Sequence, residues 1–123
     1  MSKDFDGWNS VKQKVNGFNN KYIKSGEIWI CNLGINVGYE IDGKGSRYFR
    51  PVLVLSGFGK EGGIVFPMTT VSKSNKFLFE ISENNFINLT QIRFMDSKRF
   101  SRIIGKVDFR TIQLIKKQFL KII

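Results

Sequence analysis

The sequence predicts a small, mainly β protein of the α+β class, curled into a barrel with a helix at each end. Five to seven short runs are rich in β-branched and aromatic residues and are separated by turn residues, as is typical of strands. Twelve glycines against two prolines suit many tight turns. At both ends of the chain, apolar residues instead recur at three- and four-residue spacing, which indicates amphipathic helices. The 123 residues are enough for one domain.

The first helix is predicted over residues 5–16, where Phe5, Trp8, Val11 and Val15 form an apolar face. We expect this short helix to depend on docking to the rest of the chain. The second helix begins after Asp108, a residue that favours the N-cap position. Its predicted apolar stripe consists of Phe109, Ile112, Ile115, Phe119 and Ile122.

Between the helices, the strands follow one another closely. The predicted ranges are 27–33, 51–56, 64–69, 76–81, 86–95 (a strand pair or one kinked strand) and 103–107, with one helical turn at 97–100. The run PVLVLS at 51–56 is apolar throughout, which predicts a strand buried on both faces. Pro67 predicts a bend or a sheet edge. Trp29 and Cys31 share one face of their strand, and we expect both to pack in the core.

Residues 34–50 form a long, polar, glycine-rich segment between the first two strands. Long loops in compact domains are often functional. This loop contains Tyr39, Tyr48 and Phe49, which suit either stacking on unpaired bases or packing the loop onto the barrel. A second glycine-rich segment, 57–62, formally matches GxGxxG, but a strand-like run follows it where a dinucleotide site requires a helix. We therefore predict a hairpin loop there.

The formal charge of +10 indicates an anionic partner, such as nucleic acid, a membrane surface or an acidic protein. Residues 98–123 carry eight basic side chains and one acidic side chain. No apolar run reaches the length of a membrane span, and the N-terminus lacks the apolar core of a secretory signal. With a single cysteine, Cys31, no intrachain disulfide is possible. These features favour a cytoplasmic protein that does not enter a membrane.

Several kinds of catalysis are excluded by composition. The chain has no histidine, so Ser-His-Asp and Cys-His catalysis are excluded. One cysteine without histidine also rules out a structural zinc site. The ten acidic residues are scattered, which argues against a two-metal nuclease centre. We therefore expect neither a metal ion nor a cofactor.

A basic, histidine-free protein can still cleave RNA, because the ribose 2′-hydroxyl is its own nucleophile. The protein must hold the phosphate, offset the charge that develops on its oxygens, and move protons. An arginine fork suits the first two tasks, and a hydroxyl group adds a donor. Arg50 at the junction of the long loop and a buried strand, and Thr69-Thr70 at the end of another strand, are candidates. Each also has an ordinary structural explanation when taken alone.

The order and spacing of five blocks, followed by the terminal helix, resemble the MazF/PemK family of toxin endoribonucleases from about Lys24 to Ile123. The blocks are 26–30 (GEIWI), 38–40 (GYE), 50–56 (RPVLVLS), 66–70 (FPMTT, followed by Ser72-Lys73) and 91–100 (QIRFMDSKRF). Together they are far more specific than any one block alone.

The resemblance implies an SH3-like barrel of the CcdB/PemK type that forms a homodimer. It implies metal-independent cleavage of single-stranded RNA through a 2′,3′-cyclic phosphate, and inhibition by a cognate antitoxin protein. The catalytic arginine of the family falls on Arg50, its serine or threonine on Thr69, and an acidic loop residue on Glu40. The residues expected to bind RNA are Lys44, Arg47, Thr70, Lys73, Gln91 and Arg93. Residues 1–23 are then a helical extension to a barrel domain at 24–123.

Two departures from the family pattern leave alternatives open. Thr90 stands where many members have an acidic residue directly before the glutamine. The loop between Glu40 and Arg50 is also longer than in compact members, which weakens the assignment of Glu40 as the base. One alternative is a non-catalytic nucleic-acid binder on the same barrel. Another is a CcdB-like toxin that poisons gyrase by protein contact, for which the pair of Arg50 and Thr69 is not needed.

Overall fold

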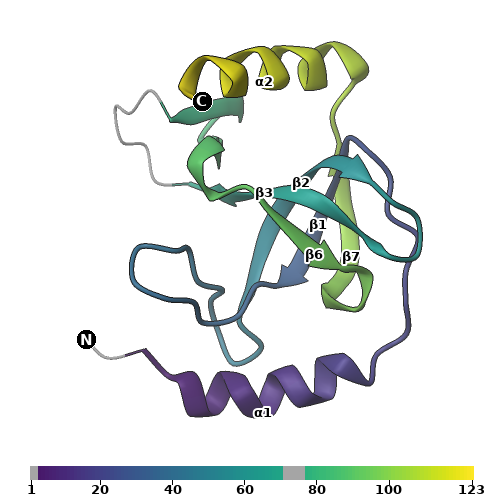
Figure 1. Cartoon of the computed structure of the whole chain (residues 1–123), viewed down its shortest axis with the longest axis vertical. Helices are drawn as coiled ribbons and strands as arrows, with labels where there is room; N and C mark the ends of the chain where they lie inside the picture. Colours follow the sequence, from purple (N-terminus) through teal and green to yellow (C-terminus); the bar gives the residue numbers. More distant parts are fainter. Residues whose placement is uncertain (1–2, 71–76) are drawn as a thin grey trace.

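A computed structural model describes residues 3–70 and 77–123 (Figure 1). The elements are α1 (Phe5–Asn16), β1 (Glu27–Asn32), β2 (Phe49–Gly57), β3 (Gly62–Thr69), β4 (Leu78–Ser82), β5 (Asn85–Asn88), the 3₁₀ turn η1 (Leu89–Gln91), β6 (Arg93–Asp96), the 3₁₀ turn η2 (Ser97–Arg99), β7 (Phe100–Lys106) and α2 (Phe109–Ile122). The α+β class and both terminal helices are as predicted. The segment at 86–95 is a strand pair, because η1 separates β5 from β6.

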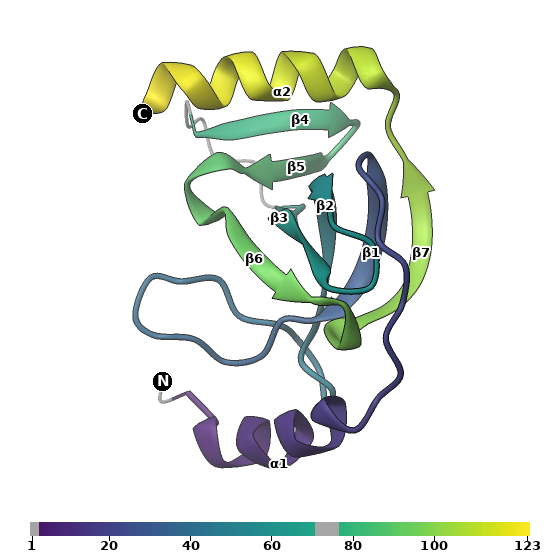
Figure 2. The same ribbon diagram turned by 45° about the vertical axis from the view of Figure 1, so that its right-hand side comes forward.

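The strands form one antiparallel sheet in the order β4-β5-β3-β2-β1-β7, with β6 also paired to β3. Only η2 connects β6, beside β3, to β7, beside β1. This short connection requires the sheet to curl on itself, and Figure 2 shows the resulting barrel between the two helices. The helices therefore lie at opposite ends of the molecule (Figures 1 and 2).

The central strands β2 and β3 are buried on both faces because the molecule has two apolar cores. Val52 and Val54 lie in the core inside the barrel, together with Met95 and Phe100. The intervening Leu53 belongs to a second core, between the sheet and α2. This alternation confirms the two-sided burial predicted for the run PVLVLS, since side chains along a strand point to opposite faces.

Pro67 lies within the sheet, at a point where the partner of β3 changes. On one side it pairs with Val52 of β2. On the other side, β3 pairs with β6 as far as Val65 and with β5 from Met68 onward. Proline has no N–H to give to a ladder. Because Pro67 lies where the pairing of β3 changes from β6 to β5, the sheet can accommodate this proline in a central strand. The sequence had suggested a bend or a sheet edge at this position.

Trp29 and Cys31 both pack in the barrel core, as predicted. The indole of Trp29 makes an edge-to-face contact with Phe100, with ring centroids 5.6 Å apart. Cys31 has no exposed surface, and burial raises the pKa of its thiol well above the usual range. A buried thiol of this kind is an unreactive packing group.

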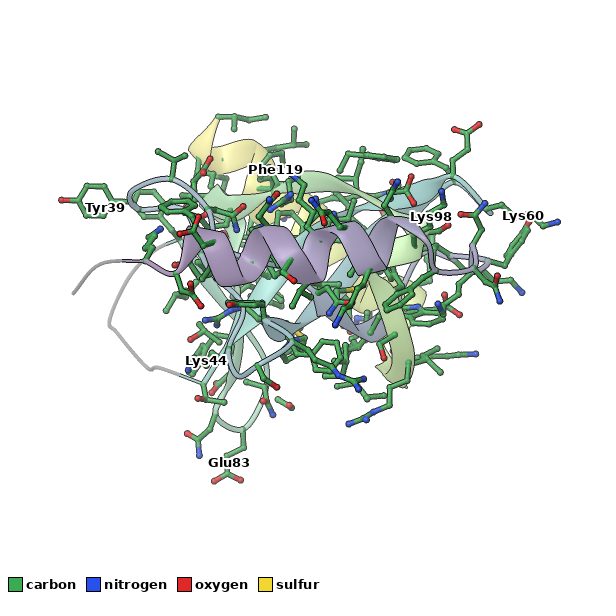
Figure 3. All side chains as sticks on the ribbon, turned by 90° about the horizontal axis from the view of Figure 1, so that it is seen from below. Tyr39, Lys44, Lys60, Glu83, Lys98 and Phe119 are labelled. Atoms are coloured by element: carbon green, nitrogen blue, oxygen red, sulfur yellow. The ribbon has the colours of Figure 1, made fainter. Side chains whose placement is uncertain are left out.

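Helix α1 docks on the barrel through Trp8, whose indole contacts the side chains of Tyr48 and Arg99. The indole contacts the ring of Tyr48 at 5.5 Å, and the guanidinium of Arg99 lies 5.5 Å from its centroid. Gly34, at φ +84°, allows this approach, because a Cβ there would lie 2.2 Å from Trp8 Cε2. The predicted docking is thus confirmed, and Tyr48 packs the loop rather than facing solvent. Tyr39, in contrast, projects from the molecule and is fully exposed (Figure 3).

Helix α2 begins where predicted, with the Asp108 carboxylate accepting a hydrogen bond of 2.8 Å from the Thr111 amide. Ile112 and Ile115 are buried against the second core. The expectation for Phe109 was wrong. It is 77% exposed, because the buried stripe starts one turn later, at Ile112. Within the described ranges, neither helix is long and apolar enough to cross a membrane.

Candidate active site

Arg50, the second residue of β2, is fixed by two backbone carbonyls from different parts of the chain. Its Nε donates to the carbonyl of Asp42 at 2.7 Å, and its Nη1 donates to the carbonyl of Met68 at 3.0 Å. The side chain thus links the long loop to the end of β3. Burial lowers the pKa of Arg50, and the nearby Asp42 carboxylate partly offsets this shift. Arginine remains charged in proteins, so the group is a positioned cation.

Arg50 lines a surface pocket of about 110 Å³ with three other predicted residues. Lys44 comes from the long loop, Thr69 ends β3, and Thr70 follows it. Thr69 is half-buried and pairs with Phe86 of β5. The pocket therefore brings together an arginine fork, a lysine and two hydroxyl groups, which are groups that bind phosphate.

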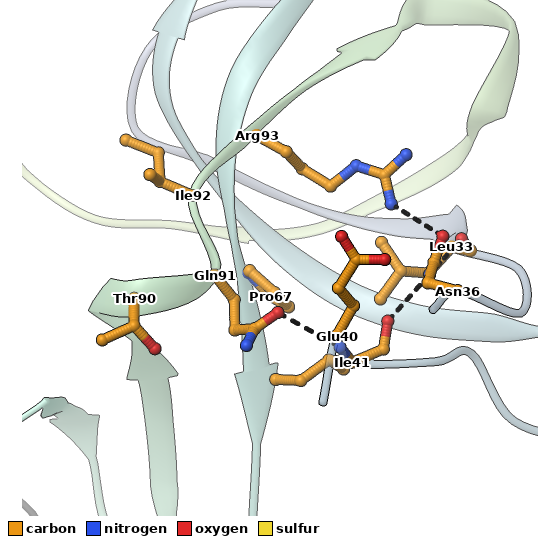
Figure 4. Close-up of a pocket in the computed structure, with 9 residues that line it drawn as sticks. All are labelled: Leu33, Asn36, Glu40, Ile41, Pro67, Thr90, Gln91, Ile92 and Arg93. Atoms are coloured by element: carbon orange, nitrogen blue, oxygen red, sulfur yellow. Dashed lines mark hydrogen bonds between the residues drawn. The ribbon is translucent and has the colours of Figure 1, made fainter. Parts of the chain in front are cut away.

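Glu40 lines a second and larger pocket, of about 410 Å³, with Gln91 and Arg93 (Figure 4). Glu40 is exposed, and its Oε1 accepts a hydrogen bond of 2.8 Å from the amide of Val37. Arg93 Nη1 lies 3.4 Å from Asn36 Oδ1. This pocket combines one carboxylate, one amide and one guanidinium.

The Gln91 side chain connects the end of η1 to the long loop. Its Oε1 accepts from the Ile41 amide at 3.1 Å, and its Nε2 lies 3.4 Å from the Tyr39 carbonyl. The amide group thus bridges two backbone groups on either side of Glu40. Gln91 therefore helps to determine where the Glu40 carboxylate lies.

The two pockets lie on either side of one strand end. Pro67 lines the Glu40 pocket, and the next two residues, Met68 and Thr69, line the Arg50 pocket. The long loop shows the same arrangement. Ile41 lines the Glu40 pocket, and the carbonyl of the next residue, Asp42, accepts the hydrogen bond from Arg50. Seven of the predicted site residues are therefore brought together in two neighbouring groups: Glu40, Gln91 and Arg93 in one pocket, and Lys44, Arg50, Thr69 and Thr70 in the other.

One predicted RNA-binding residue, Arg47, lines a third pocket, beside α1. Another, Lys73, lies outside the described residues. Lys44 is held in the Arg50 pocket by a backbone pair with Phe49, through hydrogen bonds of 2.7 and 2.9 Å.

The sequence analysis missed the residues that hold the loop. The Asp42 carboxylate accepts from the Asn36 amide at 2.7 Å and pairs with Lys3 Nζ at 3.2 Å. Lys3 also donates to the carbonyls of Asn36 and Gly38. Asp42 was visible as a second acidic residue near Glu40, but no local pattern pointed to Lys3.

Thr90 is exposed, and its hydroxyl donates to Asn88 Oδ1 at 2.7 Å. This position therefore supplies a hydroxyl group at the rim of the Glu40 pocket, in place of the acidic residue of the family pattern. Among the described residues, no three cysteine, aspartate or glutamate side chains converge as metal ligands would.

The curled sheet and the arginine-centred pocket together define a small α+β barrel with a positioned guanidinium at its surface. The family model for the PemK-like, MazF-like toxin of type II toxin-antitoxin system matches residues 24–123. The chain therefore belongs to this family, and the resemblance seen in the five blocks is confirmed. Helix α1 lies before the matched range.

Among solved structures, the chain is similar to an "Endoribonuclease in complex with its cognate antitoxin from Mycobacterial species". The TM-score is 0.58 at 14% sequence identity, and the match covers 80% of this chain and 92% of that chain. At this identity the likeness supports the fold, which agrees with the predicted barrel. No curated protein matches the chain.

Proposed function

We propose that this chain is the toxin of a toxin-antitoxin system and an endoribonuclease that cleaves single-stranded RNA without a metal ion. The observation that carries the proposal is the position of Arg50, held by two carbonyls in a pocket with Thr69 and Lys44. The family supplies the toxin assignment, and the similar solved structure is an endoribonuclease bound to its antitoxin.

In the proposed reaction, the ribose 2′-oxygen attacks the adjacent phosphorus and the bond from phosphorus to the 5′-oxygen breaks. The 2′-hydroxyl gives its proton to a base, and the leaving 5′-oxygen takes up a proton. The products are a 2′,3′-cyclic phosphate and a 5′-hydroxyl. Arg50 offsets the charge on the non-bridging oxygens, which is greatest in the transition state. In this proposal Thr69, which lines the same pocket, contributes a hydroxyl group to phosphate binding.

We assign Glu40 as the candidate base. Its carboxylate is exposed at the mouth of the larger pocket, and Gln91 and Arg93 line the same pocket. RNA that crosses the end of β3 would contact both pockets, because consecutive residues of this strand line them. The Asp42 carboxylate lies nearer to Arg50 in the chain, but it binds Lys3 and the Asn36 amide.

The test is incubation of a long, end-labelled single-stranded RNA with the protein in EDTA, beside the Arg50→Ala variant. We expect discrete fragments with 5′-hydroxyl ends from the wild type and intact RNA from the variant. Intact RNA from the wild type, with salt-sensitive binding retained, would contradict cleavage and support the non-catalytic binder. Intact RNA without binding would direct the next test to gyrase.

Glu40→Gln and Asp42→Asn distinguish the two candidate bases. If Glu40 is the base, Glu40→Gln lowers kcat and removes the acidic limb of the pH profile, because a glutamine cannot accept the proton. Asp42→Asn then retains that limb, even if it weakens the loop. The reverse result would assign the base to Asp42.

The proposed partners are single-stranded RNA, a cognate antitoxin protein and a second copy of the chain, in the cytoplasm. The net charge of +10 supports RNA binding, because lysine and arginine displace counterions from phosphates. Light scattering at several protein concentrations tests the homodimer.

A further inference from the structure

A second large pocket lies between α1 and the barrel, and it shares the lining residue Phe49 with the Arg50 pocket. Its volume is about 600 Å³, against about 110 Å³ for the Arg50 pocket. It is lined by α1, by the segment that follows α1, and by residues beside the starts of β2 and β7. Its volume is in the usual range for ligand pockets, roughly 300–1,000 Å³.

The lining of this pocket, which we call the α1 pocket, is strongly basic. Lys14, Lys21 and Arg47 all line it, and none of its described lining residues is acidic. Between described residues, the structure records one ion pair, that of Lys3 with Asp42. The three cations of the α1 pocket therefore have no acidic partner in the described ranges, and they are suited to bind an anion.

The same pocket contains two aromatic rings. Phe18, two residues after the end of α1, is 47% exposed, although its amide is fixed by a hydrogen bond of 2.9 Å to the Val15 carbonyl. Phe49 is half-buried. Cations together with an exposed aromatic ring form the usual surface for single-stranded nucleic acid, whose bases stack while its phosphates pair with lysine and arginine.

Phe49 connects the α1 pocket to the Arg50 pocket, since it lines both. The backbone on this side is well fixed. The buried Asn32 donates from Nδ2 to the Arg47 carbonyl at 2.8 Å, and Lys44 pairs with Phe49. RNA that leaves the Arg50 pocket beside Phe49 would therefore meet a residue that also lines the α1 pocket.

We infer that the α1 pocket binds the segment of single-stranded RNA that flanks the cleaved phosphate. This inference rests on the proposed function and extends it to a part of the chain before the family match. Lys14 and Lys21 pair with phosphates, and Phe18 stacks on an unpaired base. The helix α1 then forms part of the RNA-binding surface as well as holding the loop. Figure 3 looks onto α1, with the barrel behind the helix.

The test measures binding of uncleavable 2′-O-methyl RNA of mixed sequence, in a short and a long form. The first variant is the double substitution Lys14→Gln and Lys21→Gln. Its matched control is Lys116→Gln with Lys117→Gln, which removes the same charge from exposed positions of α2, at the opposite end of the molecule. The second variant is Phe18→Ala, at a position that is 47% exposed, and its circular dichroism spectrum and urea unfolding are compared with those of the wild type.

For the long RNA, we expect the lysine variant to lower the slope of log K against log salt by about 1.4, since single strands give about 0.7 for each phosphate. The control leaves the slope unchanged. Phe18→Ala weakens binding of the long RNA by at least about fivefold, from loss of one stacked base. Binding of the short RNA, which occupies the Arg50 pocket, stays the same in all variants.

Equal slopes and affinities for the wild type and the α1-pocket variants would overturn the inference. An equal loss in the α2 control would overturn it too, because the effect would then reflect overall charge. Cleavage of unmodified RNA is measured separately. If the protein cleaves RNA but the α1-pocket variants bind the long RNA as the wild type does, only the inference about the α1 pocket is rejected. Length-dependent binding without cleavage rejects the proposed reaction and leaves the binding pocket supported.

Discussion

The guanidinium of Arg50 is held by the carbonyl of Asp42, at 2.7 Å from Nε, while the carboxylate of Asp42 pairs with Lys3 at 3.2 Å. One loop residue thus connects the proposed phosphate-binding arginine to the N-terminal segment. A side chain held in this way loses little further conformational entropy when it binds phosphate, so it is preorganised for the proposed role.

Arg50→Lys tests whether the fork of donors matters in addition to the charge. Lysine keeps the charge but offers one ammonium group, which cannot reach both carbonyls and also present a planar fork to phosphate. We expect kcat to fall by about 100-fold or more, while affinity for uncleavable RNA changes little. Arg102→Lys, at an exposed position of β7, is the matched control. A wild-type kcat in Arg50→Lys would show that charge alone is sufficient.

Gln91→Ala tests the bridge from η1 to the long loop. The variant loses two hydrogen bonds, to Ile41 and Tyr39, and we expect the free energy of unfolding to fall by about 1–2 kcal/mol. Hydrogen exchange of the amides at 37–42 becomes faster, as measured by mass spectrometry. Gln113→Ala, at an exposed position of α2, is the control. Unchanged exchange at 37–42 would show that the loop is held by its other contacts.

The hydrogen bond between Asp4 and Tyr48 predicts a defined pH dependence of stability. The Tyr48 hydroxyl donates to Asp4 Oδ2 at 2.7 Å, and the amide of Gly7 donates to Oδ1 at 2.9 Å. These bonds lower the pKa of Asp4 from its ordinary 3.8. A carboxyl group with a lowered pKa in the folded state stabilises the fold above its unfolded pKa, and the effect is lost as pH falls through the folded pKa.

The same hydrogen bond raises the pKa of Tyr48 from its ordinary 10.0. The stability that Tyr48 contributes is therefore fully present below pH 10.0, and it is lost as pH rises through the raised pKa of the folded state. We therefore expect Tyr48→Phe to be less stable than the wild type at neutral pH, with the difference vanishing toward strongly acidic pH. Urea unfolding across this range measures it, with Tyr22→Phe, at an exposed position, as the control. A constant difference at all pH values would contradict the role of Asp4.

Ile115→Ala tests the packing of α2 on the sheet. Ile115 has no exposed surface and lies in the core beneath the helix, so the substitution leaves a cavity and costs about 2–5 kcal/mol. Leu114→Ala, at the neighbouring position that is 48% exposed, should cost far less. Urea unfolding of both variants measures the difference. Equal losses would mean that α2 does not pack on the sheet through this face.

Local sequence patterns determined most of the elements of this protein. Alternation and apolar runs predicted the strands, and Asp108 predicted the start of α2, because these signals depend on neighbouring residues and on the period of each element. The ordered blocks also predicted the family. They correctly placed Arg50 at the start of a buried strand and Thr69 at the end of another.

The tertiary structure alone decided which of these residues lie together. Arg50 and Thr69 share one pocket, while Glu40 lies in the next pocket with Gln91, whose side chain binds a loop residue fifty positions earlier in the chain. Lys3 reaches Asp42 across a similar separation. Contacts of this kind arise when the sheet curls and α1 docks. Such contacts produce no periodic pattern in the sequence, because a contact between two distant residues does not restrict which residues stand next to either of them.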